Sequence, residues 1–174
     1  MEEIYLIKPE MKHKDMVVSY KQEHLNYGEE VIHGSSMLDK KNTYEEWLTC
    51  IKNNQNEDTL AEGWVVSSTY LVMDKLEKMV IGMIDTRHQL NETLRNYGGH
   101  IGYSVRPNER KKGYATRMLL LALEICKKME INEVMLTCDK QNVASQRTII
   151  KCGGKLEKEI RIDDEMVQFY WIEV

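Results

Sequence analysis

Residues 100–139 hold a strand, a basic turn, a helix and a second strand in direct succession. Residues 100–107 (HIGYSVRP) are predicted to form a strand that Pro107 ends, because proline lacks the N–H group that a sheet ladder needs. Residues 133–139 (EVMLTCD) are almost continuously apolar, which predicts a strand covered on both faces. A helix between two such strands indicates a parallel pair with a right-handed crossover. This succession constrains the fold more than any other feature.

The helix of this unit, residues 113–130, has the most regular apolar spacing in the chain. Its predicted buried stripe consists of Met118, Leu121, Leu123 and Ile125. Three further helices are predicted from apolar spacing and start or stop signals, over residues 13–28, 43–54 and 142–153. Thr43 and Glu46 form a capping-box signature, and Asn142 is the predicted N-cap of the last helix.

The other segments that are rich in β-branched residues, or alternate in polarity, are predicted to be strands. They are residues 2–9, residues 64–74, residues 78–88 and two strands around a turn within residues 155–174. The short charged segment 75–77 predicts a hairpin between the second and third of these. Residues 91–99 are either one helical turn or a long loop, and residues 29–42 are a loop expected to face a substrate. The expected fold is α/β, a mixed sheet with helices on both faces.

The length of 174 residues predicts a single domain over residues 1–174. Hydrophobic residues make up 42% and charged residues 30%, which is typical of a globular protein rather than a disordered one. The formal net charge of -4 argues against a general nucleic-acid binder, because such proteins neutralise phosphates with an excess of basic residues. We expect no nucleic-acid partner.

The four cysteines are scattered without the spacing of a zinc site, so core or free thiols in a reducing compartment are expected. The five histidines do not have metal-site spacing either, so we expect no metal. The N-terminus resembles no signal peptide, and no apolar run approaches the length of a membrane span. A cytoplasmic location without membrane attachment is therefore predicted.

The turn before the central helix has the chemistry of an anion-binding site. Arg110 offers a planar fork suited to phosphate, and Lys111 and Lys112 add positive charge. Gly113 allows positive φ and a close approach of the backbone, while the first N–H groups of a helix lack partners within the helix. These features predict a cradle for a pyrophosphate. The alternative is a solvated loop that only precedes a helix.

At this point the sequence resembles the GNAT superfamily of N-acetyltransferases. Residues 110–115 (RKKGYA) match the R/Q-x-x-G-x-G/A loop of that family, and Asn142 and Ser145 match its later helix start. Gly153 follows that helix at the spacing the family shows. The resemblance extends over nearly the whole chain, and residues 85–107 further resemble a bacterial subgroup of unassigned substrate.

The resemblance implies a mostly antiparallel sheet with one splayed parallel strand pair, acetyl-coenzyme A as the donor and a primary amine as the usual acceptor. It implies that the backbone of Ser104, Val105 and Arg106 bonds the pantetheine arm and the thioester carbonyl. The pyrophosphate would lie on the backbone N–H groups of Lys112, Gly113, Tyr114, Ala115 and Thr116. Asn142 would face the pantetheine or its phosphate end. The acceptor that the resemblance leads us to expect is an amine on a small molecule or a peptide.

Acetyl transfer requires a neutral amine, although a free alkylamine has a pKa near 10.4. Asp85, His88 and His100 are the candidates for the general base, because they lie beside the central strands. A backbone N–H near Val105 would stabilise the oxyanion. The alternative is that the histidines are structural, and that Asp85 caps a turn or pairs with Arg87.

Ile149 occupies the position at which many family members have a tyrosine. Isoleucine cannot protonate the leaving thiolate, so the hypothesis is direct transfer without an acid at this position. Tyr114, Tyr103 or water could serve instead. The departure also leaves open a coenzyme A-binding sensor on the same fold, and a plain nucleotide-binding module is the second alternative. The C-terminal strand could pair with a second copy, so a monomer or a homodimer is expected.

Overall fold

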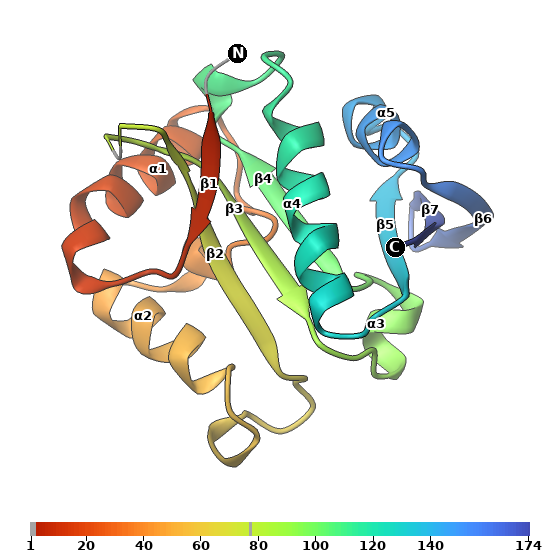
Figure 1. The fold of residues 1–174 in the computed structure, drawn as a ribbon, viewed down its shortest axis with the longest axis horizontal. Coiled ribbons are helices and arrows are strands. Elements are labelled where there is room, and N and C mark those ends of the chain that lie inside the picture. The colour runs from red at the N-terminus through yellow and green to blue at the C-terminus, as the bar shows by residue number, and fades with distance from the viewer. Residues whose placement is uncertain (1–2, 77) are drawn as a thin grey trace.

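The larger sheet consists of four antiparallel strands in the order β1-β2-β3-β4 (Figure 1). Their bounds are Ile4–Ile7 for β1, Ser67–Asp74 for β2, Val80–Arg87 for β3 and Ile101–Val105 for β4. The computed structural model describes residues 3–76 and 78–174, so Glu2 of the predicted first strand and Glu77 of the predicted turn lie outside the described residues. The predicted hairpin is confirmed as the β2–β3 pair.

Helices cover both faces of this sheet. Helices α1 (Lys14–Asn26) and α2 (Tyr44–Asn53) pack against one face, and α4 (Tyr114–Lys128) packs against the other (Figure 1). The predicted capping box starts α2, where the Thr43 hydroxyl accepts a hydrogen bond from the Glu46 N–H at 3.2 Å. The predicted fold class is therefore confirmed. Within the described residues, no helix is both long enough and apolar enough to cross a membrane.

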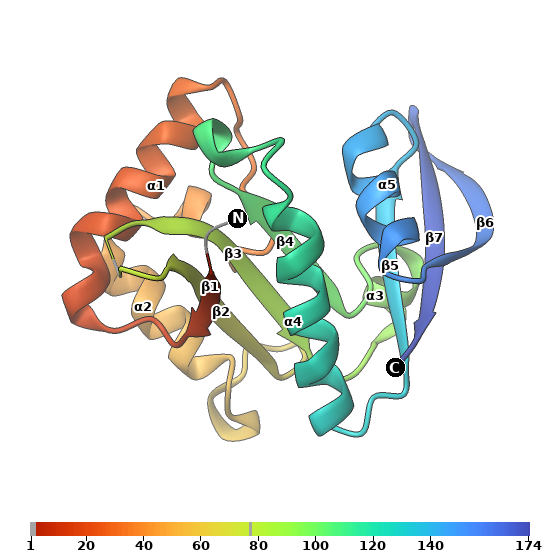
Figure 2. The ribbon, with the colours of Figure 1, turned by 45° about the horizontal axis from the view of Figure 1, so that its top comes forward.

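Three strands form a second sheet in the order β5-β7-β6 (Figure 2). Their bounds are Glu133–Asp139 for β5, Lys155–Ile162 for β6 and Glu165–Glu173 for β7. Helix α5 (Val143–Lys151) joins β5 to β6 and packs beside α4. The segment before β4 forms a short helix, α3 (Glu92–Asn96), which settles the choice between a helical turn and a loop. Single 3₁₀ turns occur at Met11–His13, Leu38–Lys40, Glu57–Thr59 and Pro107–Glu109.

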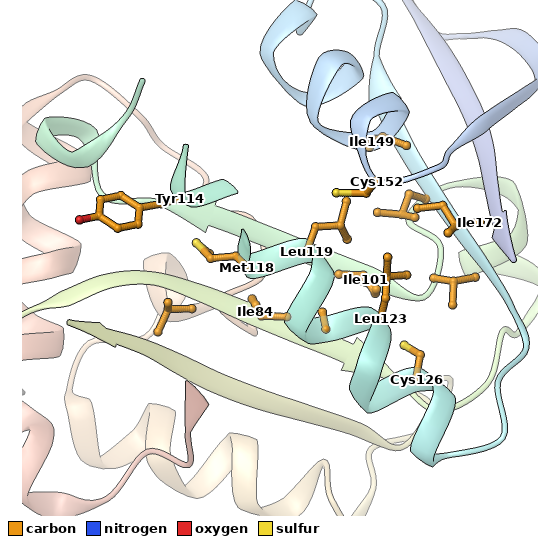
Figure 3. Close-up of a cluster of buried hydrophobic side chains, with 14 of the residues drawn as sticks. Ile84, Ile101, Tyr114, Met118, Leu119, Leu123, Cys126, Ile149, Cys152 and Ile172 are labelled. Carbon is orange, nitrogen blue, oxygen red and sulfur yellow. The ribbon is translucent and has the colours of Figure 1, made fainter. Parts of the chain in front are cut away.

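The buried stripe of α4 differs from the predicted one. Figure 3 shows α4 side chains packed beside Ile84, Ile101 and Ile172. The fully or almost fully buried α4 residues include Met118, Leu119, Ala122, Leu123 and Cys126. Leu121 and Ile125 are only half-buried. The prediction was wrong at these two positions, because a period of 3.6 residues places 118, 119, 122, 123 and 126 on one side of a helix.

The two sheets are joined beside the N-terminal ends of β4 and β5. The N–H of His100 donates to the Met135 carbonyl at 2.8 Å, and the His100 Nδ1 accepts from the Met135 N–H at 2.9 Å. Gly99 has φ +68° and lies directly against the Met135 carbonyl, where a Cβ would collide. Beyond this joint the two strands run apart (Figures 1 and 2), and no ladder connects them within residues 3–76 and 78–174. The predicted parallel pair stays a prediction, because the bridge found here is a single antiparallel one.

Trp47 provides a test of the packing between α2 and the loop that follows α1. Its ring is fully buried, and its Nε1–H donates to the Ser35 carbonyl at 2.6 Å. Trp47→Phe should lower the free energy of unfolding by about 1–3 kcal/mol, because it leaves this buried carbonyl without its donor. Urea denaturation measures the change. Trp64→Phe at an exposed position is the matched control and should change stability by less than about 0.5 kcal/mol. Equal effects of the two variants would contradict this account.

Candidate functional site

Strand β4 presents alternate backbone groups to the gap between the two sheets. The Arg106 N–H donates to Ile81 and the Arg87 N–H donates to His100, both at 2.8 Å, at the two ends of the β3–β4 register. Hydrogen-bonded pairs alternate along an antiparallel ladder, so Ser104 is bonded to β3. Tyr103 and Val105 therefore direct their N–H and C=O groups away from β3, toward the gap. The prediction named Ser104, Val105 and Arg106 alike, but only the backbone of Val105 has this direction.

The side chains of β4 point to opposite sides of the sheet. The Ser104 hydroxyl lies 2.9 Å from the Tyr20 hydroxyl of α1, on the face that α1 and α2 cover. The Tyr103 hydroxyl lies 3.0 Å from the Ser145 hydroxyl of α5, on the other side. Burial raises the pKa of Tyr103 to about 12, so its phenol keeps its proton at neutral pH. Tyr103 and Ser145 thus connect β4 to α5, the helix that follows β5.

The predicted anion-binding turn lies at the C-terminal end of β4. Lys111 and Gly113 both have positive φ, of 63° and 83°. Gly113 is the N-cap of α4, so no side chain at this position caps the helix. The first helical turn contains no acidic residue. Tyr114 is buried, while Ala115 and Thr116 are half-buried. A helix start of this kind directs N–H groups and the positive end of the helix dipole toward an anion.

The cationic side chains of the turn are not all directed outward. Both terminal nitrogens of Arg110 bond the Glu29 carboxylate, at 2.6 and 2.8 Å, and its Nε–H donates to the Val105 carbonyl at 3.1 Å. Lys112 bonds Glu109 at 2.9 Å, and Lys111 is exposed. The predicted phosphate fork of Arg110 is therefore already engaged by a carboxylate.

Arg106 is also tied within the protein. Its Nε–H donates to the Val80 carbonyl at 2.8 Å, and its Nη1 bonds the Glu23 carboxylate at 2.7 Å. Glu23 and Glu29 were missed in the sequence, where they show only as acidic residues at the end of a helix and in a loop.

Helix α5 begins beside the same gap. The Asn142 side chain accepts a hydrogen bond from the Ser145 N–H at 3.1 Å, so the predicted N-cap is confirmed. Ser145 directs its hydroxyl to Tyr103. Ile149, one turn further along α5, is fully buried in the apolar cluster that also contains Cys152 (Figure 3). The gap is thus bordered by the edge of β4, the start of α4 and the start of α5.

Asp85 is a buried carboxylate under the loop that follows α1. It accepts hydrogen bonds from Ser36 at 2.9 Å and Thr69 at 3.0 Å, and it forms an ion pair with Arg87 at 3.1 Å. The pairing with Arg87 was one of the two structural alternatives. Gly34 of the same loop lies directly against the backbone of Gly102, so the loop covers β4 at the level of Asp85.

The two candidate histidines occupy different places. His100 belongs to the joint, and burial lowers its pKa to about 4, with a smaller contribution from Arg95 and Arg87. His88 lies just past β3, where its Nε2 is 3.0 Å from the Ser68 hydroxyl. Burial, followed by the charge of Lys8, lowers the pKa of His88. Among the described residues, no hydrogen bond links Asp85, His88 and His100 into one cluster.

The distribution of possible metal ligands and the state of the thiols follow from the described part of the chain. Within residues 3–76 and 78–174, no group of three or more His, Cys, Asp or Glu side chains could hold a metal ion. The four cysteines are free thiols, and burial raises the pKa of Cys126 and Cys138 to about 11.

Comparisons with known proteins identify the family of the chain and relatives of its fold. The family model described as an acetyltransferase (GNAT) domain matches residues 6–155. The ribosomal-protein-S5-alanine acetyltransferase from Vibrio fischeri has a similar fold, with a TM-score of 0.71, 15% identity and coverage of 99% of this chain and 94% of that one. The microcin C7 self-immunity acetyltransferase MccE, solved with acetyl-CoA and AMP, has a TM-score of 0.70 and 19% identity, covering 100% and 94%.

Mutant forms of the spermidine/spermine N-acetyltransferase SpeG from Vibrio cholerae have a TM-score of 0.67 and 13% identity, covering 98% of this chain and 93% of that one. At these identities the structural likeness concerns the fold. The comparison with curated protein sequences found no relative.

The joint at His100 predicts a dependence of stability on pH. The folded-state pKa of His100 is about 4, below its ordinary value of 6.5, so the unfolded chain binds a proton between these values and the folded chain does not. The free energy of unfolding should therefore fall as the pH falls from 6.5 to 4, with a His100 contribution of up to about 1.4 kcal/mol per pH unit.

His100→Asn should remove this contribution, because an amide oxygen can accept from the Met135 N–H without titrating. Urea denaturation at several pH values measures the slope for each protein. His33→Asn, at an exposed position, is the matched control. Parallel slopes for the wild type and His100→Asn would contradict the prediction.

Proposed function

Because the chain belongs to the GNAT acetyltransferase family, as the match over residues 6–155 shows, we propose that it transfers an acetyl group from acetyl-coenzyme A directly to a primary amine. The family makes the protein an acyltransferase. The observation that carries the proposal is the edge of β4 that faces away from β3, where the Val105 N–H and the Tyr103 backbone groups lead to the glycine-capped start of α4. We propose that residues 1–174 act as one catalytic domain, in the cytoplasm, as a monomer or a homodimer.

The turn fits a pyrophosphate through its backbone rather than through Arg110. The N–H groups from Lys112 to Thr116 would meet the phosphates, with Lys111 and Lys112 near them. Positive φ at Lys111 and Gly113 supports this assignment, because such conformations expose successive N–H groups to an anion. Since the guanidinium of Arg110 is bonded to Glu29, we assign Arg110 to holding the turn.

The pantetheine arm would continue along β4 and bond the outward N–H of Val105 and the outward backbone groups of Tyr103, since the Val105 carbonyl already accepts from Arg110. Acetyl-coenzyme A supplies the thioester, and the Val105 N–H is the proposed donor to its oxyanion, with the Tyr103 N–H next along the same edge. Asn142 and Ser145 would border the arm from α5. Ser104 and Arg106 leave this set, because their polar groups are engaged by β3 and α1.

Asp85 is the base candidate that the β3–β4 register favours. A strand rises about 3.4 Å per residue. Asp85 is paired with Gly102, which lies next to Tyr103 and roughly 10 Å along the strand from Val105. The register places His88 level with residue 99, roughly 20 Å along the strand from Val105. His100 already uses Nδ1 in the joint. The amine would reach Asp85 through the loop of residues 29–42, whose Ser36 bonds this carboxylate.

Tyr103 is the proposed donor of a proton to the departing thiolate. Ile149 cannot act, and Figure 3 shows Tyr114 at the opposite end of the apolar cluster from Ile149. The Tyr103 hydroxyl enters the gap from β4 and contacts α5 one turn before Ile149. A protein hydroxyl could thus reach the thiolate from the strand instead of the helix.

Acetyl-coenzyme A should stabilise the protein, and the effect should depend on Gly113. A ligand at one hundred times its dissociation constant adds about 2.7 kcal/mol, which raises the Tm of a domain of this size by roughly 5–10 °C. The shift should be absent in Gly113→Asp, because Asp adds negative charge at the turn. Gly63→Asp is the matched control, since Gly63 also has positive φ (81°) and has open space around it.

The same thermal scan with ATP tests selectivity, and thiol release over a panel of primary amines tests transfer. No shift with acetyl-coenzyme A in a well-folded wild type would overturn the proposal. A shift without thiol release from any amine would leave donor binding and remove the assigned reaction.

Tyr103→Phe should lower kcat about 100-fold at neutral pH, within the range of general acid catalysis, and change the KM for acetyl-coenzyme A less than about threefold. Steady-state thiol release measures both constants. Tyr97→Phe, at an exposed tyrosine in the segment before β4, should leave them unchanged. An unaltered kcat in Tyr103→Phe would assign the proton to water.

A further inference from the structure

Two glutamates at the end of α1 bond the segment that leads into the anion-binding turn. Glu23 Oε2 accepts from Arg106 Nη1 at 2.7 Å, and its Oε1 accepts from the Asn108 N–H at 2.9 Å. Glu29, just past the helix, receives both terminal nitrogens of Arg110. The turn is therefore held at its start by carboxylates that lie about 80 residues earlier in the chain.

The ion pairs of Glu23 and Glu29 are partly buried. The side chains of Arg110 and Glu29 are 33% and 30% exposed, and those of Arg106 and Glu23 are 7% and 20% exposed. The hydrogen bonds from Arg110 hold the pKa of Glu29 below its ordinary value. Burial alone would raise the pKa of Glu23, but the Asn108 N–H and Arg106 hold it below its ordinary value. Both carboxylates are thus charged acceptors at neutral pH.

His24 forms a hydrogen bond with the Glu29 carboxylate, which Arg110 also bonds. Its Nδ1 lies 2.6 Å from Glu29 Oε2, and since a carboxylate can only accept, the Nδ1–H donates. Burial lowers the pKa of His24, which keeps the ring neutral. Within the described residues its Nε2 has no hydrogen-bond partner, so Glu29 is the polar contact that orients the ring. Glu29 therefore connects the buried side of α1 to Arg110.

Arg110 has all three of its nitrogens bonded inside the protein, to Glu29 and to the Val105 carbonyl. It lies three residues before Gly113 and ties the end of β4 to the start of the turn. We propose that Glu29, acting through Arg110, is a positioning residue that holds residues 110–113 in the form that receives the phosphates of the donor, with Glu23 as a second anchor at Arg106 and Asn108. This inference rests on the proposed function.

The test separates the phosphate end of the donor from its acyl end. Glu29→Gln keeps the size of the side chain but removes the charge that Arg110 bonds. The Kd for acetyl-coenzyme A, measured by calorimetry, should rise at least tenfold. The Kd for S-acetyl-pantetheine, which lacks the pyrophosphate, should stay within twofold when it is followed by NMR titration. Arg110→Gln should show the same split, and the double variant should be no weaker than either single one.

Glu45→Gln is the matched control. It removes an exposed ion pair between Lys14 at the start of α1 and Glu45 of α2, whose charged atoms lie 2.7 Å apart. Among the described residues, neither of these two contacts the anion-binding turn, so both Kd values should stay unchanged. An equal loss for both donors in Glu29→Gln would show a merely structural role and overturn the inference, as would an unchanged Kd for acetyl-coenzyme A. If Glu29→Gln does not fold, Arg110→Gln decides by the same criteria. A wild type that binds neither donor would overturn the proposed function itself.

Discussion

The pair of hydrogen bonds between His100 and Met135 determines how the rest of the site is built. It fastens the two sheets at one end of β4 and uses a side-chain nitrogen where a regular ladder would use a backbone carbonyl. A ladder continued along β4 and β5 would engage the backbone of Tyr103 and Val105. Because pairing stops at the joint, the backbone N–H groups of both residues stay unpaired with β5 at the edge of a rigid strand, which orients them better than a loop would.

Most basic side chains of the turn bond carboxylates of the protein, although its composition suggests that they are free to bind an anion. Two of the four arginine and lysine side chains between residues 106 and 112 bond glutamates of the α1 region, and a third bonds Glu109. In the proposed function, the attraction for the phosphates of the donor therefore depends largely on backbone N–H groups and the dipole of α4. Such donors are aligned before a ligand arrives, so binding does not have to order a long flexible side chain.

The sequence allowed the element order and the helix starts at Thr43 and Asn142 to be predicted, because these depend on neighbours within a few residues. The pairing of Glu29 with Arg110 and of Tyr103 with Ser145 could not be predicted, since it depends on how α1 and α5 pack against β4. The register decided which residues of β4 face the gap. The stripe of α4 was misjudged at Leu121 and Ile125, where neighbouring leucines and isoleucines leave the phase of an apolar helix ambiguous.

The alternation along β4 has a consequence for how the family can change. Ser104 is engaged by β3 and α1 and so serves the fold, whereas the proposed function assigns the adjacent Tyr103 and Val105 to the ligand. A substitution at a residue that serves the fold changes few contacts of a residue assigned to the ligand, and the reverse also holds, because neighbouring residues of a strand point in opposite directions. Natural variation could therefore alter the acyl donor or the rate one residue at a time, without first finding a more stable scaffold.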